Sequence, residues 1–505
     1  MRFARPSIAG IAGGVLIALL LAGAPIARSQ PEPSSSPSAV KSATTQRNAA
    51  MQQAVEKLVK TIDRYGGKVG VHVIDVTSGT VLAEHAAGTP FNPASNMKLV
   101  TAATAMWKLS PSHTYRTALY AQRKGTNIGD LVLRSYGDPS LTTKDLWALT
   151  NALTRWGIKR VKGDVLIDQS YFDANYVPPG FEQQPNEWAE FRAPVSAVAL
   201  NANTVTMHVA PRRAGDSALV TFAPEGFVDL AGRVGTGASG SAQSVTLSLV
   251  PTVGRVKAQV GGSLPEDSSR MRVTKRVDDP TLYAGYALRA ILVEQGIQVD
   301  GKVRAGGEKA RKRLTLHQSA PLATLLRRLG KDSDNFYAEM IFKSLAGGNK
   351  RRGLTSESGA EVVRAYLAEI KANDEGIVIR NGSGLFDTNR LTARSLTTVL
   401  RATYRDPNMQ AEYVAHLSVG GQDGTLRWRF RDKQTKGRIR AKTGTLASVA
   451  SLSGYVMRAG DESPVAFSIM VNNVNGKVPG ARVAIDNCVK ALAAEVARTS
   501  RAPAR

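Results

Sequence analysis

The pattern of hydrophobic residues changes twice along this chain of 505 residues. Residues 49–112 show helical spacing on either side of a short alternating hairpin, whereas residues 113–275 consist of short alternating runs separated by Gly, Pro, Asp and Ser. Helical spacing returns after residue 276, and strands and a last helix follow towards residue 500. Amphipathic helices and strands at both ends must share one core. We therefore predict a discontinuous α/β domain, 49–112 plus 276–500, with a central antiparallel sheet flanked by helices. The β-rich region 113–275, of one or two modules, interrupts it.

The N-terminus has the pattern of a secretory signal. Arg2 and Arg5 precede an apolar run from Ile8 to Leu21, and Ala27-Arg28-Ser29 offers small residues for cleavage. We predict a signal peptide over 1–29 and a disordered Pro/Ser-rich linker over 30–48. An uncleaved membrane anchor is the alternative, although the apolar run is short for a span. Either outcome predicts an extracytoplasmic, periplasmic or secreted, bacterial protein.

The charge balance is strongly basic. Lys and Arg number 66 against 41 Asp and Glu, which gives a formal net charge of +25. Such a surface attracts anionic wall polymers or lipid headgroups. No stripe of interleaved aromatic and basic residues accompanies the charge, so we predict no specific nucleic-acid ligand. The single cysteine, Cys488, excludes an intrachain disulfide, and its apolar surroundings predict a buried structural thiol.

The first chemistry-bearing motif is Ser95-Asn96-Met97-Lys98 at the start of an apolar helical pattern. Residues three apart share one face of a helix. Lys98 can take the proton of Ser95 if burial or a second cation lowers its pKa. The alternative is an ordinary helix-start serine with a lysine reaching solvent. A second match, Ser38 to Lys41, falls in the predicted linker and lacks the apolar helix.

Ser333-Asp334-Asn335 is the second motif. Ser333 would relay a proton between a leaving amine and the base, and the amide of Asn335 would hold the substrate and Lys98. The same residues would also serve simply to start the following helix.

Lys442-Thr443-Gly444-Thr445 is the third motif, at the expected beginning of a strand. Glycine weakens a strand unless something approaches its backbone closely, and a substrate peptide along the sheet edge would do so. Lys442 would attract a carboxylate, and the N–H of Thr445 with that of Ser95 would form an oxyanion hole. An ordinary strand with a glycine kink is the alternative.

The three motifs, in this order, form the set found in penicillin-binding proteins and class A β-lactamases. The chain resembles the low-molecular-mass class C penicillin-binding proteins, the D-alanyl-D-alanine carboxypeptidase/endopeptidases of the penicillin-binding protein 4 type. Further segments carry the resemblance over nearly all of the mature chain: Gly137–Leu141, Ala193–Ala197, Leu200–Asn203, Gly382–Leu385 and Gly421–Leu426.

The resemblance implies a serine β-lactamase/transpeptidase-like fold with accessory domains between the first two motifs. It implies Ser95 as nucleophile, Lys98 as base, Ser333 and Asn335 as relay and anchor, and Lys442 to Thr445 as the substrate-binding strand. Peptidoglycan stem peptides would be the substrates and β-lactams covalent inhibitors, with no metal or cofactor. A β-lactamase or esterase on the same scaffold, and a catalytically idle wall-binding protein, are the alternatives.

The chain departs from the family pattern away from these motifs. Arg380-Asn381 stands where an aspartate is usual, and Phe386 follows Leu385 where a serine is usual. These departures bear on substrate preference.

Overall fold

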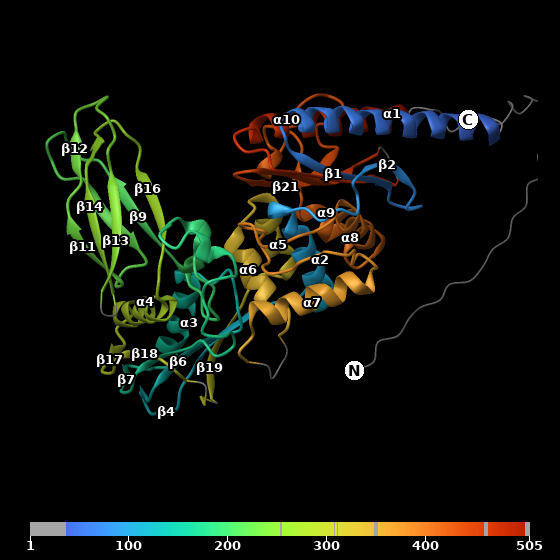
Figure 1. The fold of residues 1–505 in the computed structure, drawn as a ribbon. Helices are drawn as coiled ribbons and strands as arrows, with labels where there is room; N and C mark the ends of the chain where they lie inside the picture. The colour runs from blue at the N-terminus through green and yellow to red at the C-terminus, as the bar shows by residue number, and fades with distance from the viewer. Residues whose placement is uncertain are drawn as a thin grey trace, which may run out of the picture.

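The computed structural model describes residues 37–252, 255–307, 309–310, 312–347, 352–458 and 463–499. Figure 1 shows two parts, an α/β unit built from both ends of the chain and an elongated inserted part beside it. The two ends meet in one sheet, because β1 (Lys68–Asp75) pairs with β23 (Val465–Asn472) along its whole length.

The sheet of the α/β unit has six strands, and each strand is antiparallel to its neighbours. This confirms the predicted central antiparallel sheet. Its order is β2 (Val81–His85), β1, β23, β22 (Val449–Val456), β21 (Ile439–Leu446) and β20 (Ser418–Val419).

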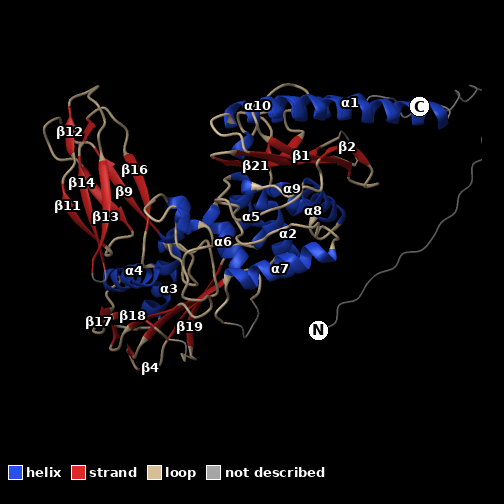
Figure 2. Ribbon diagram, viewed as in Figure 1, coloured by secondary structure: helices blue, strands red, loops and turns tan. Residues whose placement is uncertain are grey.

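Helices cover both faces of this sheet, as predicted (Figure 2). The terminal helices α1 (Pro37–Arg64) and α10 (Val478–Thr499) pack together over one face, and their apolar residues form one core with it. A second core lies under the other face, where the remaining helices gather. These are α2 (Met97–Leu109), α5 (Leu322–Lys331), α6 (Asn335–Ser344), α7 (Ser356–Glu369), α8 (Ala393–Arg405) and α9 (Gln410–His416).

The inserted part has two modules. The first holds a five-stranded sheet in the order β18 (Val303–Ala305), β8 (Val165–Asp168), β6 (Leu131–Ser135), β3 (Arg116–Tyr120) and β19 (Arg313–Gln318). A smaller sheet runs in the order β17 (Gln298–Val299), β7 (Arg160–Val161), β5 (Asn127–Ile128) and β4 (Arg123–Lys124). The helices α3 (Thr143–Arg155) and α4 (Pro280–Glu294) complete this module.

The second module is formed by strands between Thr204 and Arg276, and we call it the sandwich. One of its sheets has the order β10 (Leu219–Ala223), β9 (Thr204–Ala210) and β16 (Met271–Arg276). Another contains β11 (Val228–Gly232), β14 (Arg255–Gly261) and β13 (Thr246–Thr252), and a third pairs β12 (Gly235–Gly237) with β15 (Ser263–Pro265).

Two predicted boundaries are wrong. The inserted part does not end at residue 275, because α4 and the strands β17 to β19 complete its first module and its sheets continue to Gln318. Apolar residues of α4 such as Tyr283 and Leu288 lie in the same core as β6 and β8, so this helix cannot be assigned to the α/β unit.

The predicted disordered linker is also wrong from residue 37 onwards, because α1 begins at Pro37. The second Ser-x-x-Lys match, at Ser38, therefore lies in a helix. The predicted signal peptide, 1–29, lies outside the described residues. None of the described helices is long and apolar enough to cross a bilayer.

Candidate active site

Ser95 lies in a tight turn that leads into α2. A short 3-10 helix, Ala94–Asn96, precedes α2, and Ala94 adopts a left-handed conformation with φ of 47°. The residues around Ser95 are buried, while Ser95 itself is partly exposed. Lys98 follows one turn later on the same helix face. The predicted Ser95–Lys98 pair is therefore in place, with the hydroxyl facing solvent and the amine beneath it.

Lys98 is surrounded by three oxygen atoms. Its Nζ lies 3.1 Å from Ser95 Oγ, 2.7 Å from Asn335 Oδ1 and 2.7 Å from the carbonyl oxygen of Ser383. Burial lowers the pKa of Lys98 to about 7, against the opposing effect of the carboxylates of Glu339 and Asp334. A carbonyl and an amide oxygen only accept hydrogen bonds. In the neutral amine these two acceptors take both N–H groups, which leaves the lone pair for the hydroxyl of Ser95.

Glu339 holds the loop that supplies the carbonyl of Ser383. It lies four residues after Asn335 on α6, and its two carboxylate oxygens accept from the N–H groups of Gly382, at 3.0 Å, and Ser383, at 2.7 Å. Burial raises the pKa of Glu339, while its hydrogen bonds and the charge of Lys98 oppose that shift. Glu339 lies outside the three sequence motifs and was not predicted, although its i+4 spacing from Asn335 places it on the same helix face.

Ser333 and Asn335 approach the site from the N-terminus of α6. Asp334 caps this helix by accepting from the N–H of Tyr337, so the motif does start a helix as well. Ser333 has φ of 58°, and its hydroxyl accepts from Lys442 Nζ at 2.8 Å. The Nδ2 of Asn335 donates to the carbonyl oxygen of Phe191, at 3.4 Å, which brings the inserted part into contact with the site.

Lys442 is fully buried on β21. The strand begins at Ile439, so the motif does lie on a strand. Burial, followed by the charge of Lys98, lowers the pKa of Lys442 well below its usual value. Besides Ser333, its Nζ contacts the carbonyl oxygen of Thr443 at 2.7 Å. One buried lysine thus contacts Ser95 and Asn335 and the other contacts Ser333, and the charge of Lys98 acts on Lys442.

The edge of β21 beside the site is largely open. β20 pairs only with Arg440 and Ala441, and no other described strand pairs along this edge from Lys442 onwards. Thr445 is exposed there, and the hydroxyl of Thr443 donates to that of Thr425 at 2.9 Å. A peptide can add to such an edge through main-chain hydrogen bonds.

Gly444 is closely packed within the protein. A Cβ at this position would overlap Ser451 Oγ on β22, and it would come within 2.9 Å of the carbonyl oxygen of Pro93 and 3.0 Å of Ala94 Cβ. The close neighbours that require glycine are therefore Ser451, whose hydroxyl donates to the carbonyl of Pro93, and the turn carrying Ser95. Gly384 serves the same turn from the other side, since a Cβ there would overlap the carbonyl oxygen of Ala94.

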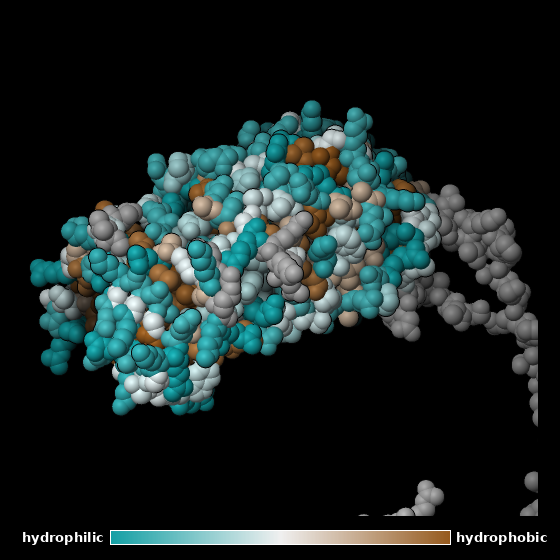
Figure 3. Space-filling model, turned by 90° about the horizontal axis from the view of Figure 1, so that it is seen from below, coloured by the Kyte–Doolittle hydropathy of each residue, from teal (hydrophilic) through white to brown (hydrophobic). Residues whose placement is uncertain are grey.

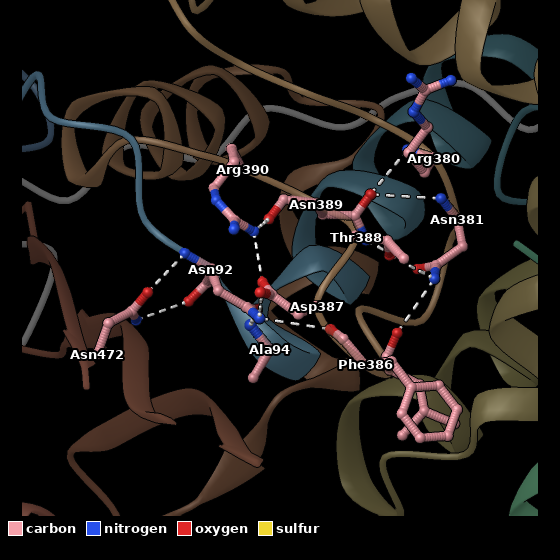
Figure 4. A network of polar contacts seen from close by, with 11 residues as sticks. Asn92, Ala94, Arg380, Asn381, Phe386, Asp387, Thr388, Asn389, Arg390 and Asn472 are labelled. Carbon is pink, nitrogen blue, oxygen red and sulfur yellow. Dashed lines mark hydrogen bonds and ion pairs between the residues drawn. The ribbon is translucent and has the colours of Figure 1, made fainter. Parts of the chain in front are cut away.

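The side chain of Asn92 fixes this turn (Figure 4). Its Oδ1 accepts from the N–H of Ala94 at 2.8 Å, and its Nδ2 donates to Asp387 Oδ1 at 2.9 Å. Its backbone N–H and carbonyl are both bonded to the side chain of Asn472 on β23. Arg390 holds Asp387 at 2.6 Å. The left-handed Ala94 is therefore held by side chains from two distant segments.

The other titratable candidates lie outside this cluster. Cys488 is buried in α10, where burial raises the pKa of its thiol to about 12. No three His, Cys, Asp or Glu side chains of the described residues gather as a set of metal ligands.

Comparison with known proteins identifies relatives over most of the chain. The sequence profile of the D-Ala-D-Ala carboxypeptidase 3 (S13) family matches residues 51–494. A D-alanyl-D-alanine carboxypeptidase of Actinomadura sp. (strain R39) is 32% identical over 479 residues, which cover 91% of this chain and 87% of that one. The D-alanyl-D-alanine carboxypeptidase DacB of Haemophilus influenzae is 26% identical over 81% of this chain and 86% of its own.

The fold also has a counterpart among solved structures. The crystal structure of penicillin binding protein 4 from H. influenzae superposes with a TM-score of 0.72 at 24% identity, covering 85% of this chain and 98% of that chain. This likeness confirms the predicted fold class, including the inserted β-rich region.

Proposed function

Since this chain belongs to the D-Ala-D-Ala carboxypeptidase 3 (S13) family and is a serine-type D-Ala-D-Ala carboxypeptidase, we propose that Ser95 is its nucleophile and Lys98 its general base. The observation that carries this assignment is the environment of Lys98 Nζ, which contacts Ser95, Asn335 and Ser383. A base is most effective when its pKa is close to the working pH, and burial brings Lys98 to about 7.

Acylation begins when Ser95 Oγ attacks the carbonyl carbon of the penultimate D-alanine and its proton passes to Lys98. The N–H groups of Ser95 and Thr445 stabilise the negative oxygen of the tetrahedral intermediate. Breakage of the C–N bond needs a proton on the leaving amine. Ser333, bonded to Lys442 Nζ at 2.8 Å, supplies a route for it. The proton that Lys98 took from Ser95 reaches the amine by this route, so Lys98 is neutral again when water attacks the acyl-enzyme. Lys98 accepts the proton of that water and returns it to Ser95 Oγ as the ester bond breaks.

Substrate binding uses the open edge of β21. The peptide extends along Thr443 to Thr445, and the amide of Asn335 holds its backbone. The terminal carboxylate lies near Lys442 and Thr443. Its negative charge acts against the burial that lowers the pKa of Lys442, so substrate binding favours the charged form of this lysine.

The proposed location of the protein rests on its N-terminal sequence and its net charge. We propose export to the periplasm by the segment 1–29, with stem peptides of peptidoglycan as substrates. β-Lactams would acylate Ser95, as expected of reagents that resemble the scissile amide. The net charge of +25 favours attachment to the anionic wall or membrane surface.

Labelling with a fluorescent penicillin tests the assignment of Ser95. Purified wild-type protein and Ser95→Ala are each mixed with the reagent and examined by intact mass. One adduct on the wild type and none on the variant is expected. Absence of an adduct on folded wild type, without rapid consumption of the penicillin, would refute the mechanism.

A further inference from the structure

One face of the sheet β10-β9-β16 is polar and turned away from the core of the sandwich. Thr204, Thr206 and His208 alternate along β9 on this face, and Arg272 lies directly opposite His208 on β16. The intervening residues of β9, such as Met207, are buried in the cores. Alternation along the strand therefore separates a core face from a face that presents hydroxyl and basic groups.

This polar face forms one wall of a cavity of about 720 Å³. The segment Asp332–Tyr337, which includes Ser333 and Asn335, also lines the cavity, together with Glu190 and Phe191. Figure 1 shows β9 and β16 on the side of the sandwich that is turned towards α6. The cavity is thus continuous with the catalytic cluster and is shared between the inserted part and the α/β unit.

Two arginines that line the cavity differ in whether a carboxylate pairs with them. Arg328 is held by Asp332 at 3.0 Å and by Asp334 at 3.1 Å. Arg272 and His208 are both exposed, and among the described residues no carboxylate forms an ion pair with Arg272. The part of the cavity lined by β9 and β16 therefore offers an exposed guanidinium beside an imidazole, which together suit a carboxylate.

The geometry points to a substrate-binding site for the second stem peptide of a cross-link. We base this on the proposed function, in which Ser333 faces the leaving amine. Free D-alanine would occupy only the region next to Ser333, whereas in a cross-link the leaving amine carries a whole second peptide. That peptide extends from Ser333 into the cavity, and one of its carboxylates binds Arg272 and His208. The sandwich thereby gives the enzyme selectivity for cross-linked substrates.

Comparing two substrates distinguishes an effect on this site from an effect on the catalytic centre. Hydrolysis is measured for a purified cross-linked muropeptide dimer and for a monomeric pentapeptide, with wild type, Arg272→Glu and the control Lys257→Glu. Lys257 is an exposed cation on β14 of the same sandwich and does not line the cavity. We expect Arg272→Glu to raise KM for the dimer about tenfold, because attraction of the carboxylate becomes repulsion. Pentapeptide hydrolysis, penicillin acylation and the control variant stay unchanged.

Binding without turnover gives a second readout. The dimer is titrated into Ser95→Ala and into Ser95→Ala/Arg272→Glu, and the added substitution is expected to weaken binding by the same factor. Equal KM for the dimer in wild type and Arg272→Glu, or an equal rise for both substrates, would overturn the inference. Failure of wild type to react with penicillin would instead refute the proposed function.

Discussion

The α/β unit and the sandwich differ in how deeply their charged side chains are buried. The α/β unit buries Lys98, Lys442 and Glu339 almost completely, and each makes hydrogen bonds inside the protein. The sandwich keeps a smaller buried cluster, which includes Met207 and Leu264, and leaves its charged side chains at the surface. From below, the molecule shows a largely hydrophilic surface with only scattered hydrophobic areas (Figure 3).

This difference shows where the protein accepts a loss of stability for chemistry. Burying a charge costs free energy unless partners compensate for it, and the cost is tolerated where a shifted pKa serves a reaction. The α/β unit bears that cost at three groups around the site, Lys98, Lys442 and Glu339. The charged side chains of the sandwich lie at its surface and do not carry this cost. Substitutions in the sandwich are therefore expected to affect substrate choice or stability and to leave acylation intact.

The largest effect is expected from loss of the nucleophile. Ser95→Ala should lower the rate of D-Ala release by about 10⁴-fold or more, because the acyl-enzyme cannot form. Release of D-alanine from a pentapeptide measures it. Ser112→Ala, an exposed serine just beyond the other end of α2, is the matched control and should behave as wild type. Comparable activity in both variants would remove Ser95 from the reaction.

Replacing the base comes next. Lys98→Arg keeps a cation but cannot release its proton near neutral pH, so acylation should fall by about 10²–10⁴-fold. Stopped-flow acylation by a chromogenic penicillin measures this rate. Lys108→Arg makes the same change at an exposed position of α2 and should have no effect.

The wild-type pH profile tests the same residue. The base acts in its neutral form and its pKa is about 7, so the acylation rate should rise with pH and level off above that value. The folded pKa is below the unfolded one, so the unfolded state binds more protons between the two. Stability should therefore rise with pH over this interval. An acylation rate that is flat between pH 6 and 8, about one unit either side of that pKa, would contradict Lys98 as the base.

A smaller loss is expected when the nucleophile's turn is loosened. Asn92→Ala removes the acceptor for the N–H of Ala94 and the link to Asp387. Misplacement of Ser95 should reduce kcat by about 10–100-fold while the protein still folds. Steady-state kinetics with a pentapeptide show the effect, and the exposed Asn408→Ala is the control. An unchanged kcat would show that Ala94 holds its conformation without Asn92.

Glu339→Gln should change the pH profile more than the maximal rate. The carboxylate raises the pKa of Lys98, so its removal should move the rising limb of the acylation profile to lower pH. A glutamine accepts through only one of its two terminal atoms, and one N–H of Gly382 or Ser383 would lose its partner. Thermal unfolding should therefore show a loss of about 1–3 kcal/mol. A limb displaced to higher pH would contradict the electrostatic role of Glu339.

Much of the fold was predictable because its signals are local. Alternation gave the hairpin of β1 and β2 and the strands β21 to β23, and helical spacing gave α4 and α10. The helix α3 was missed inside the β-rich region, although Thr142 and Asp145 form a capping box at its start. The end of the inserted part was misplaced because α4 packs against strands far away in sequence, and a helical pattern does not indicate which sheet it covers.

In the candidate site, too, residues within local motifs were predicted and residues that depend on tertiary contacts were not. The three motifs predicted Ser95, Lys98, Ser333, Asn335 and Lys442, and the structure brings them together. Glu339, Asn92 and Phe191 were missed, since each makes contacts with segments far away in sequence: Glu339 with the Gly382–Ser383 loop, Asn92 with Asp387 and Asn472, and Phe191 with Asn335. Their contacts depend on tertiary packing, and spacing along the chain carries little information about it. Gly444 was predicted as a point of close approach by a substrate, and that stays a prediction; within the protein its close neighbours are Ser451 and the turn of Ser95.

The smallest effect on acylation is expected from the core of the sandwich. Met207→Ala and Met340→Ala make the same change at two fully buried methionines, one on β9 and one on α6. Each should destabilise its own region by about 2–5 kcal/mol through the cavity that is left. Met207→Ala should keep the acylation rate within about twofold of wild type, because distant sites act independently. Met340→Ala should slow acylation, since α6 carries Asn335 and Glu339. Equal slowing in both variants would show that the sandwich and the catalytic cluster are energetically coupled across the cavity they share.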